Sequence, residues 1–138
     1  MKKKYSYIQS VLVIITLILE ILPYGVRLTF RPSPDRTAEA FYSFFSLTTV
    51  GYGNFGCFIA AILTGVLLVL SLCYIKWQKK ALLYWIRIIS GLAALSLGAG
   101  IILYGIYSYT ISGFCIEGLL LFLFIGSMLK KGREQITV

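Results

Sequence analysis

Long apolar runs separated by short polar segments form the pattern of this chain. Four runs stand out, over residues 5–22, 55–75, 81–104 and 111–129. Each has roughly the 17–25 residues that a helix needs to cross the hydrocarbon of a bilayer. The apolar residues are continuous rather than alternating, which argues against a closed barrel of strands. We therefore predict an all-α membrane protein: a single four-helix bundle over residues 1–138, with one long connection at residues 23–54.

The composition favours a membrane protein over other classes. Hydrophobic residues make up 59% of the chain, the mean hydropathy is +0.87, and charged residues account for only 13%. A soluble domain has about 25% charged residues, so this chain has too few polar side chains to cover a soluble core. The net charge is +8, but the basic residues flank the apolar runs instead of covering one face. We expect the lipid bilayer as a partner, and no nucleic acid.

The basic residues also predict the orientation of the spans, because Lys and Arg beside a span stay in the cytoplasm. Three lie in the long connection: Arg27, Arg31 and Arg36. Nine others flank the opposite ends of the spans: Lys2, Lys3, Lys4, Lys76, Lys79, Lys80, Lys130, Lys131 and Arg133. This asymmetry predicts that both termini are cytoplasmic and that the long connection is extracellular. We expect the membrane to be the bacterial cytoplasmic membrane.

Residues that carry enzymatic chemistry are missing from the sequence. The chain has no His, which removes His general bases and the commonest metal ligands. No two acidic residues pair at helical spacing within a span, and the cysteines lie in or beside spans without CxxC spacing. These cysteines are Cys57, Cys73 and Cys115. We predict no catalytic residue, no metal site and no cofactor, and therefore no enzyme.

One acidic residue lies well inside a span. Glu117 falls about two turns into the fourth apolar run, and an acid at that depth is costly and often functional. Arg27 of the long connection or nearby tyrosines are its expected partners, which makes Glu117 and Arg27 a candidate intramembrane polar site. A purely structural carboxyl, hydrogen-bonded or protonated, is the alternative. Glu20 lies near the end of the first run, where we expect it at the membrane interface.

The long connection holds one specific motif, Thr48-Thr49-Val50-Gly51-Tyr52-Gly53-Asn54. It resembles the selectivity filter of potassium channels, in which four copies of T-V-G-Y-G line up backbone carbonyls around the ion. Residues 40–49 are similar to the pore loops of two-pore-domain channels, so the likeness covers residues 40–54. It implies a tetramer that conducts K⁺. The ion would bind the Thr49 hydroxyl and the backbone carbonyls of Thr49, Val50, Gly51, Tyr52 and Gly53.

Other features of the same connection predict a different structure. Asn54 stands where those channels usually have Asp, and the next apolar run begins at Phe55 almost without a linker. Residues 26–31 alternate apolar and polar, residues 32–36 are a turn cluster, and residues 41–45 can return as a partner strand. This pattern predicts an extracellular β-hairpin. The alternatives differ at residues 37–47, which a pore requires as a helix and a hairpin as an extended strand.

The whole chain also resembles a set of small bacterial four-span membrane proteins of unassigned role. The features shared with them are a Lys-rich start, a Leu-Pro-Tyr-Gly exit from the first span at residues 22–25, a Tyr-Ser-x-Phe-Ser-Leu-Thr stretch at residues 42–48 and a Gly-Tyr-x-Asn-Phe return at residues 51–55. This resemblance implies a fold but no known activity.

Three functions follow from these observations. The first is a non-catalytic integral membrane protein with a structural, accessory or interaction role. The second is a potassium-selective pore subunit that uses residues 49–53 as its filter and K⁺ as its ligand, for which a homotetramer is compulsory. The third is a transporter-like or ligand-binding bundle that uses Glu117. A homo-oligomer is compatible with all three.

Overall fold

A computed structural model describes residues 2–51 and 54–135, with side chains for residues 4–51 and 54–130. Its four long helices are α1 (Lys2–Ile21), α3 (Phe55–Trp77), α4 (Lys80–Tyr104) and α5 (Ile111–Gln135). All four are long and apolar enough to cross a membrane. They correspond to the four apolar runs, whose ends they match to within a few residues, apart from the longer end of α5.

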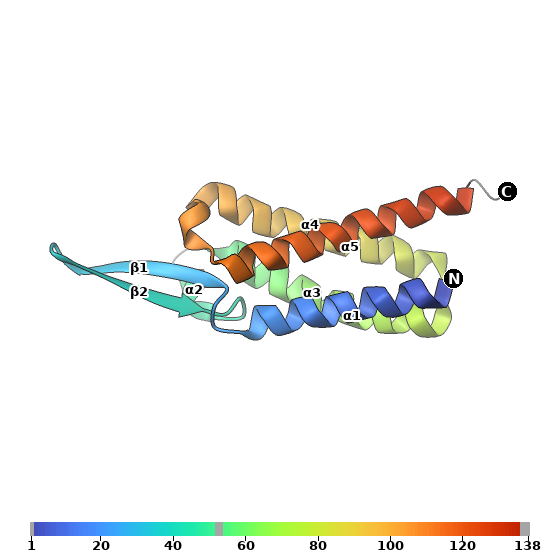
Figure 1. The fold of residues 1–138 in the computed structure, drawn as a ribbon, viewed down its shortest axis with the longest axis horizontal. Helices are drawn as coiled ribbons and strands as arrows, with labels where there is room; N and C mark the ends of the chain where they lie inside the picture. Colours follow the sequence, from blue (N-terminus) through green and yellow to red (C-terminus); the bar gives the residue numbers. More distant parts are fainter. Residues whose placement is uncertain (1, 52–53, 136–138) are drawn as a thin grey trace.

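The long helices form an antiparallel bundle in which each packs against two neighbours, in the order α1–α3–α4–α5 and back to α1 (Figure 1). An even number of antiparallel helices brings the start of α1 and the end of α5 to the same end of the bundle. The long connection between α1 and α3 leaves the opposite end, which we call the hairpin end. We call the other end the terminal end.

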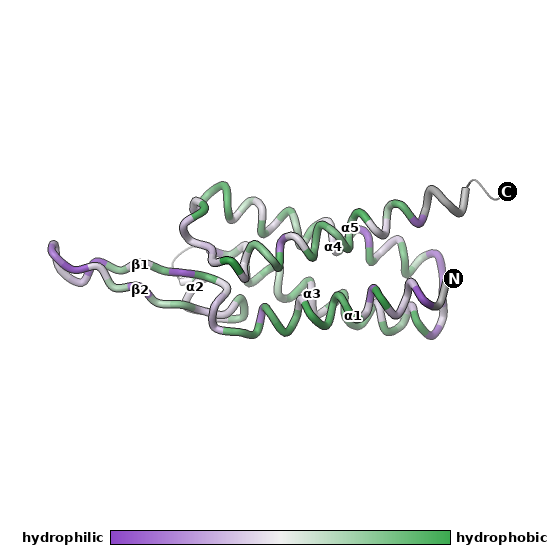
Figure 2. Tube along the Cα trace, in the orientation of Figure 1, coloured by the Kyte–Doolittle hydropathy of each residue, from purple (hydrophilic) through white to green (hydrophobic). Residues whose placement is uncertain are grey.

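The outer surface of the bundle is apolar. Large hydrophobic side chains are exposed along all four long helices, including Ile18 of α1, Val69 of α3, Leu95 of α4 and Phe122 of α5. Figure 2 shows hydrophobic residues along the helices, with hydrophilic residues gathered at the hairpin tip and at the terminal end. Such a surface suits hydrocarbon rather than water, in agreement with a membrane protein.

Short turns connect α3 to α4 and α4 to α5. Gln78 ends α3 in the left-handed conformation with a φ of 48°, and its backbone N–H donates to the Tyr74 carbonyl at 3.0 Å. Gly105 ends α4 with a φ of 81°, a value that glycine adopts at little cost because it has no Cβ. The short 3-10 helix η1 (Ile106–Ser108) follows and leads into α5.

The connection between α1 and α3 begins with the predicted hairpin. Strand β1 (Val26–Ser33) pairs antiparallel with β2 (Arg36–Tyr42), with Val26 opposite Tyr42 and Ser33 opposite Arg36. The expected partner strand at residues 41–45 is therefore wrong in position. Pairing resumes directly after Pro34 and Asp35, so the ladder is complete at Tyr42. After it, the chain turns back toward the bundle, where Phe44 is fully buried.

Candidate functional site

Helix α1 has its polar side chains facing the bundle interior. Its outer face carries large exposed hydrophobic residues such as Ile8, Val11 and Ile18. Its buried face carries a series of polar residues at helical spacing: Ser6, Gln9, Ser10, Thr16 and Glu20. This arrangement suits a helix that has lipid outside and polar contacts inside. We call the line along which this buried face meets α3 the α1–α3 seam.

Glu20 is fully buried, with no exposed surface. Its Oε1 accepts a hydrogen bond from the Thr64 hydroxyl of α3 at 2.8 Å, whereas its Oε2 is buried and has no hydrogen-bond partner among the described residues. Glu20 lies at the last turn of α1, and its position at the membrane interface stays a prediction. The structure places this carboxyl in the interior of the bundle.

The loop that follows the hairpin explains this burial. Helix α1 ends at Ile21, directly after Glu20, and the backbone N–H of Phe44 donates to the Glu20 carbonyl at 3.0 Å. The Phe44 side chain is fully buried beside Gly25, which follows the end of α1. A Cβ built at Gly25 would lie 2.6 Å from the Phe44 ring, so Phe44 packs there because residue 25 has no side chain.

A second buried polar group lies at the hairpin end of α3. The Tyr109 hydroxyl donates to Asn54 Oδ1 at 3.2 Å, and the Cys57 thiol lies 3.4 Å from the same hydroxyl and 3.7 Å from Asn54 Oδ1. Asn54 Nδ2 is buried without a partner among the described residues. Burial raises the pKa of the Tyr109 phenol above its usual range. Cys57 and Thr64 lie on the same buried face of α3, which places this group on the helix face that meets the seam.

Glu117 has a different environment from Glu20. Its side chain is only half-buried, and its Oε1 lies against Gly98 of α4, 3.5 Å from the position a Cβ would take. Its Oε2 is buried and has no hydrogen-bond partner among the described residues. The helix that carries it therefore turns this carboxyl toward α4.

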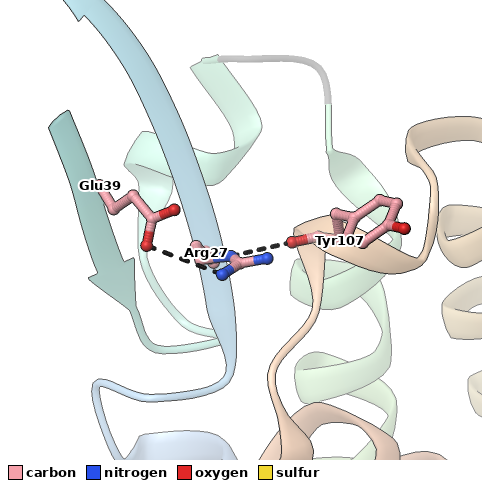
Figure 3. A network of polar contacts seen from close by, with 3 residues as sticks. All are labelled: Arg27, Glu39 and Tyr107. Carbon is pink, nitrogen blue, oxygen red and sulfur yellow. Dashed lines mark hydrogen bonds and ion pairs between the residues drawn. The ribbon is translucent and has the colours of Figure 1, made fainter. Parts of the chain in front are cut away.

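Arg27 does not join Glu117. Its Nη1 lies 3.7 Å from Glu39 Oε2 of β2, and its Nε donates to the Tyr107 carbonyl at 3.1 Å (Figure 3). The side chain therefore ties β1 to the paired strand and to η1. The predicted polar site of Glu117 and Arg27 is not formed, because Arg27 is bound at the base of the hairpin.

The filter-like motif lies in a helix where the structure describes it. Residues 47–51 form the short helix α2 (Leu47–Gly51), in which Thr49 is buried and donates its hydroxyl to the Ser46 carbonyl at 2.8 Å. Tyr52 and Gly53 lie outside the described residues. Residues 37–47 form β2 and a turn up to the start of α2. The helix that a pore requires at residues 37–47 is thus replaced by the strand that the hairpin alternative requires.

An open groove of about 450 Å³ lies where the hairpin meets the bundle. Its floor is held together by the hydroxyls of Thr110 and Ser112, which both donate to the Tyr24 carbonyl. Its walls are mostly aromatic and hydroxyl-bearing: Tyr24, Arg27, Phe41, Tyr109, Thr110, Ile111 and Ser112. These contacts fix the hairpin base on the bundle.

The terminal end of the bundle is cationic and aromatic. The Lys130 ammonium donates to the Tyr74 hydroxyl at 2.5 Å and lies 4.4 Å and 4.7 Å from the ring centroids of Tyr5 and Tyr74. Arg87 Nη2 donates to the Ser127 carbonyl at 2.7 Å. Cations over aromatic rings are stabilised by the ring quadrupole, and these groups mark the end opposite the hairpin.

The sequence carries a signal for the buried face of α1 in the spacing of its polar residues. Ser6, Gln9 and Ser10 follow one another at steps of three and one, and Thr16 and Glu20 continue the same face at a step of four. Asn54 and Tyr109 carried no such signal, because their proximity arises only from the tertiary fold.

The residues that the structure describes hold no group of three or more His, Cys, Asp or Glu that could bind a metal ion. Cys57, Cys73 and Cys115 are free thiols. No protein-family model, curated protein or solved structure matches the chain.

Proposed function

We propose that the protein is a non-catalytic integral membrane protein that presents its β1–β2 hairpin to another protein. The observation that carries this proposal is the hairpin itself, which stands off the end of the bundle (Figure 1). Residues 31–39, which include the whole tip, are exposed. An isolated two-stranded hairpin is marginally stable in water, so a long one that extends past its own bundle is best explained by a partner that covers it.

The edges of the hairpin supply the recognition chemistry. Among the described residues β2 pairs with β1 alone, whereas β1 also makes a bridge from Val26 to Tyr109. The outer edge of β2 is therefore the one left open to a further strand, and exposed edges recruit extended peptides through backbone hydrogen bonds. We infer a partner that adds an extended segment to β2.

The rigid base of the hairpin supports the same role. Arg27 anchors β1 to Glu39 and to the Tyr107 carbonyl, and Phe44 anchors the returning chain. A hairpin held at its base is pre-organised for binding, which lowers the entropy lost on association.

For the membrane and the orientation we propose the bacterial cytoplasmic membrane, with both termini in the cytoplasm and the hairpin outside. The positive-inside distribution of Lys and Arg supports this orientation, as does the shared position of the two helix ends at the cationic terminal end. A membrane-impermeant maleimide should label Ser33→Cys in intact cells and Lys79→Cys only after permeabilisation. Cys73 and Cys115 are replaced by Ser beforehand; the reverse labelling would overturn the orientation.

Photo-crosslinking tests the hairpin's role. A photoreactive amino acid at Thr37, exposed on β2, should trap a discrete partner in cells, whereas the same group at Leu95, 70% exposed on α4, should trap lipid. Replacing residues 28–40 with a short turn should abolish the trapped partner and leave the bundle inserted. Equal crosslinks from both positions, or a partner that survives the truncation, would contradict the proposal.

The potassium-pore alternative remains open to a direct test, although strand β2 (Arg36–Tyr42) occupies part of the segment that a pore requires as a helix. Gly51→Ala is a clean probe, because a Cβ at Gly51 would meet nothing within 4 Å. Potassium-selective flux into liposomes that is lost in Gly51→Ala would establish a filter and require a tetramer. Flux equal to that of empty liposomes would remove the alternative.

A further inference from the structure

Independently of the hairpin's role, we propose that Glu20 is a proton-binding site inside the bundle and that the polar α1–α3 seam carries protons to it. Two observations meet at this site. The carboxyl of Glu20 is fully buried with Oε2 unpartnered. The buried face of α1 continues from Glu20 toward the terminal end with polar side chains on both sides of the buried Val13, and those of Ser6, Gln9 and Ser10 have no hydrogen-bond partner among the described residues.

The surroundings of Glu20 favour a protonated carboxyl over a carboxylate that is paired with a Lys or Arg. Among the described residues, no Lys or Arg forms an ion pair with it, and Thr64 supplies its hydrogen bond. Arg27 is bound to Glu39, and Arg31 and Arg36 are exposed on the two strands of the hairpin. A carboxylate buried without a cation costs far more free energy than a neutral carboxylic acid. Holding a proton removes this cost and gives Oε2 a hydrogen to donate.

The titratable groups near Glu20 do not supply a positive charge either. Helix α3 carries the Cys57 thiol about two turns from Thr64 on its buried face, and the Tyr109 hydroxyl lies 3.4 Å from that thiol. Helix α5 brings Glu117, which is turned toward Gly98 of α4. None of these groups carries a positive charge that would stabilise a charged Glu20.

The seam supplies polar atoms on the terminal side of Glu20. Thr16 lies one turn from Glu20 on the same face of α1 and is fully buried. Gln9, Ser10 and Ser6 follow, with exposed fractions of 3%, 4% and 1%, and their side-chain polar atoms have no hydrogen-bond partner among the described residues. Buried polar atoms in an apolar bundle need partners. A file of water molecules along the seam satisfies them and conducts protons by hydrogen-bond exchange.

The hairpin side of the site also ends in polar groups. Cys57, Asn54 and Tyr109 form one hydrogen-bonded group at the start of α3, and Asn54 Nδ2 has no partner among the described residues. The polar lining therefore extends from Ser6 near the terminal end to Asn54 near the hairpin end. In a bundle whose outer surface is apolar, buried polar residues of this kind indicate a path for protons or water.

The first experiment asks whether Glu20 holds a proton. Infrared spectroscopy of the full-length protein in liposomes at neutral pH should show the C=O stretch of a buried carboxylic acid. A component of the band should disappear in Glu20→Gln and remain in Glu117→Gln, which removes the other carboxyl of the long helices. The absence of this band from the wild type, or an unchanged band in Glu20→Gln, would overturn the site.

The second experiment asks whether the seam carries protons. Liposomes with a pH-sensitive dye and a valinomycin-driven potential should acidify faster with wild-type protein than without protein. Glu20→Gln should lose this flux, and Glu117→Gln should keep it. The Gln9→Leu/Ser10→Ala double variant leaves Glu20 in place, and it should keep the infrared band and lose the flux. No flux with the wild type, or unchanged flux in the double variant, would overturn the pathway, and this variant serves if Glu20→Gln does not fold.

Discussion

Glu20 and Glu117 are two carboxyls in membrane-length helices, and their surroundings differ. Glu20 has no exposed surface, and it accepts hydrogen bonds from the Thr64 hydroxyl and the Phe44 backbone N–H. Glu117 is half-buried and lies against Gly98 of α4. Glu117, which lies inside its apolar run, is thus the more accessible of the two. Glu20, which lies near the end of its run, is the more deeply buried. Burial in a bundle depends on which helix face a residue occupies and on what covers the helix end, not on its distance along the run.

Replacing each glutamate with lysine should give the largest difference in stability between the two sites. In Glu20→Lys, a longer cationic side chain enters a site with no exposed surface, and an uncompensated buried charge costs about 3–5 kcal/mol. We expect Glu20→Lys to yield little folded protein. Glu117→Lys should fold, because the half-buried side chain can extend toward the membrane surface. Thermal unfolding in detergent, followed by circular dichroism, measures both; equal loss in the two variants would contradict the comparison.

Replacing a glycine near each carboxyl with alanine should give the next largest difference in unfolding free energy. Gly25→Ala places a methyl group 2.6 Å from the Phe44 ring, so the ring must move away from residue 25, at a cost of about 1–3 kcal/mol. Gly118→Ala, adjacent to Glu117, meets nothing within 4 Å and should be neutral or stabilising by up to about 1 kcal/mol. Unfolding free energies of the two variants check this. A neutral Gly25→Ala would show that Phe44 does not pack tightly beside residue 25.

Removal of the hydrogen bond to Glu20 should have a smaller effect. Thr64→Val keeps the shape of the side chain and removes the hydroxyl that lies 2.8 Å from Glu20 Oε1, at a cost of about 1 kcal/mol. Thr48→Val, on the exposed side of α2, is the control and should change stability by less than about 0.5 kcal/mol. If the hydrogen bond is the cause, the effect of Thr64→Val should shrink in a Glu20→Leu background in a double-mutant cycle.

Neutralisation of Glu117 should be the mildest change. Glu117→Gln retains the size of the side chain beside Gly98 and should shift stability by less than about 0.5 kcal/mol. Chemical unfolding curves of this variant and the wild type should have midpoints that agree within error. A large loss would mean that Glu117 has a partner outside the chain, and the contrast with Glu20 would then reverse.

The sequence by itself determined the long helices and the presence of a hairpin. Continuous apolar runs admit helices whose backbone groups bond internally, so the four runs became α1, α3, α4 and α5. Alternation from Val26 to Arg31 and the Pro-Ser-Pro-Asp cluster were enough to predict β1 and its turn. These are local signals, set by period and by turn residues.

Only the tertiary structure decided the position of β2, the conformation of the filter-like motif and the enclosure of Glu20. Strand β2 starts where the pairing register with β1 permits, and the chain after Tyr42 turns into the bundle because Phe44 fills the space beside Gly25. Thr49 then becomes buried within α2. Each of these outcomes depends on contacts between residues distant in sequence, and the polar face of α1 became a buried seam because α3 packs against it. Sequence periodicity gives the face of a helix, but only packing determines whether that face meets lipid, water or another helix.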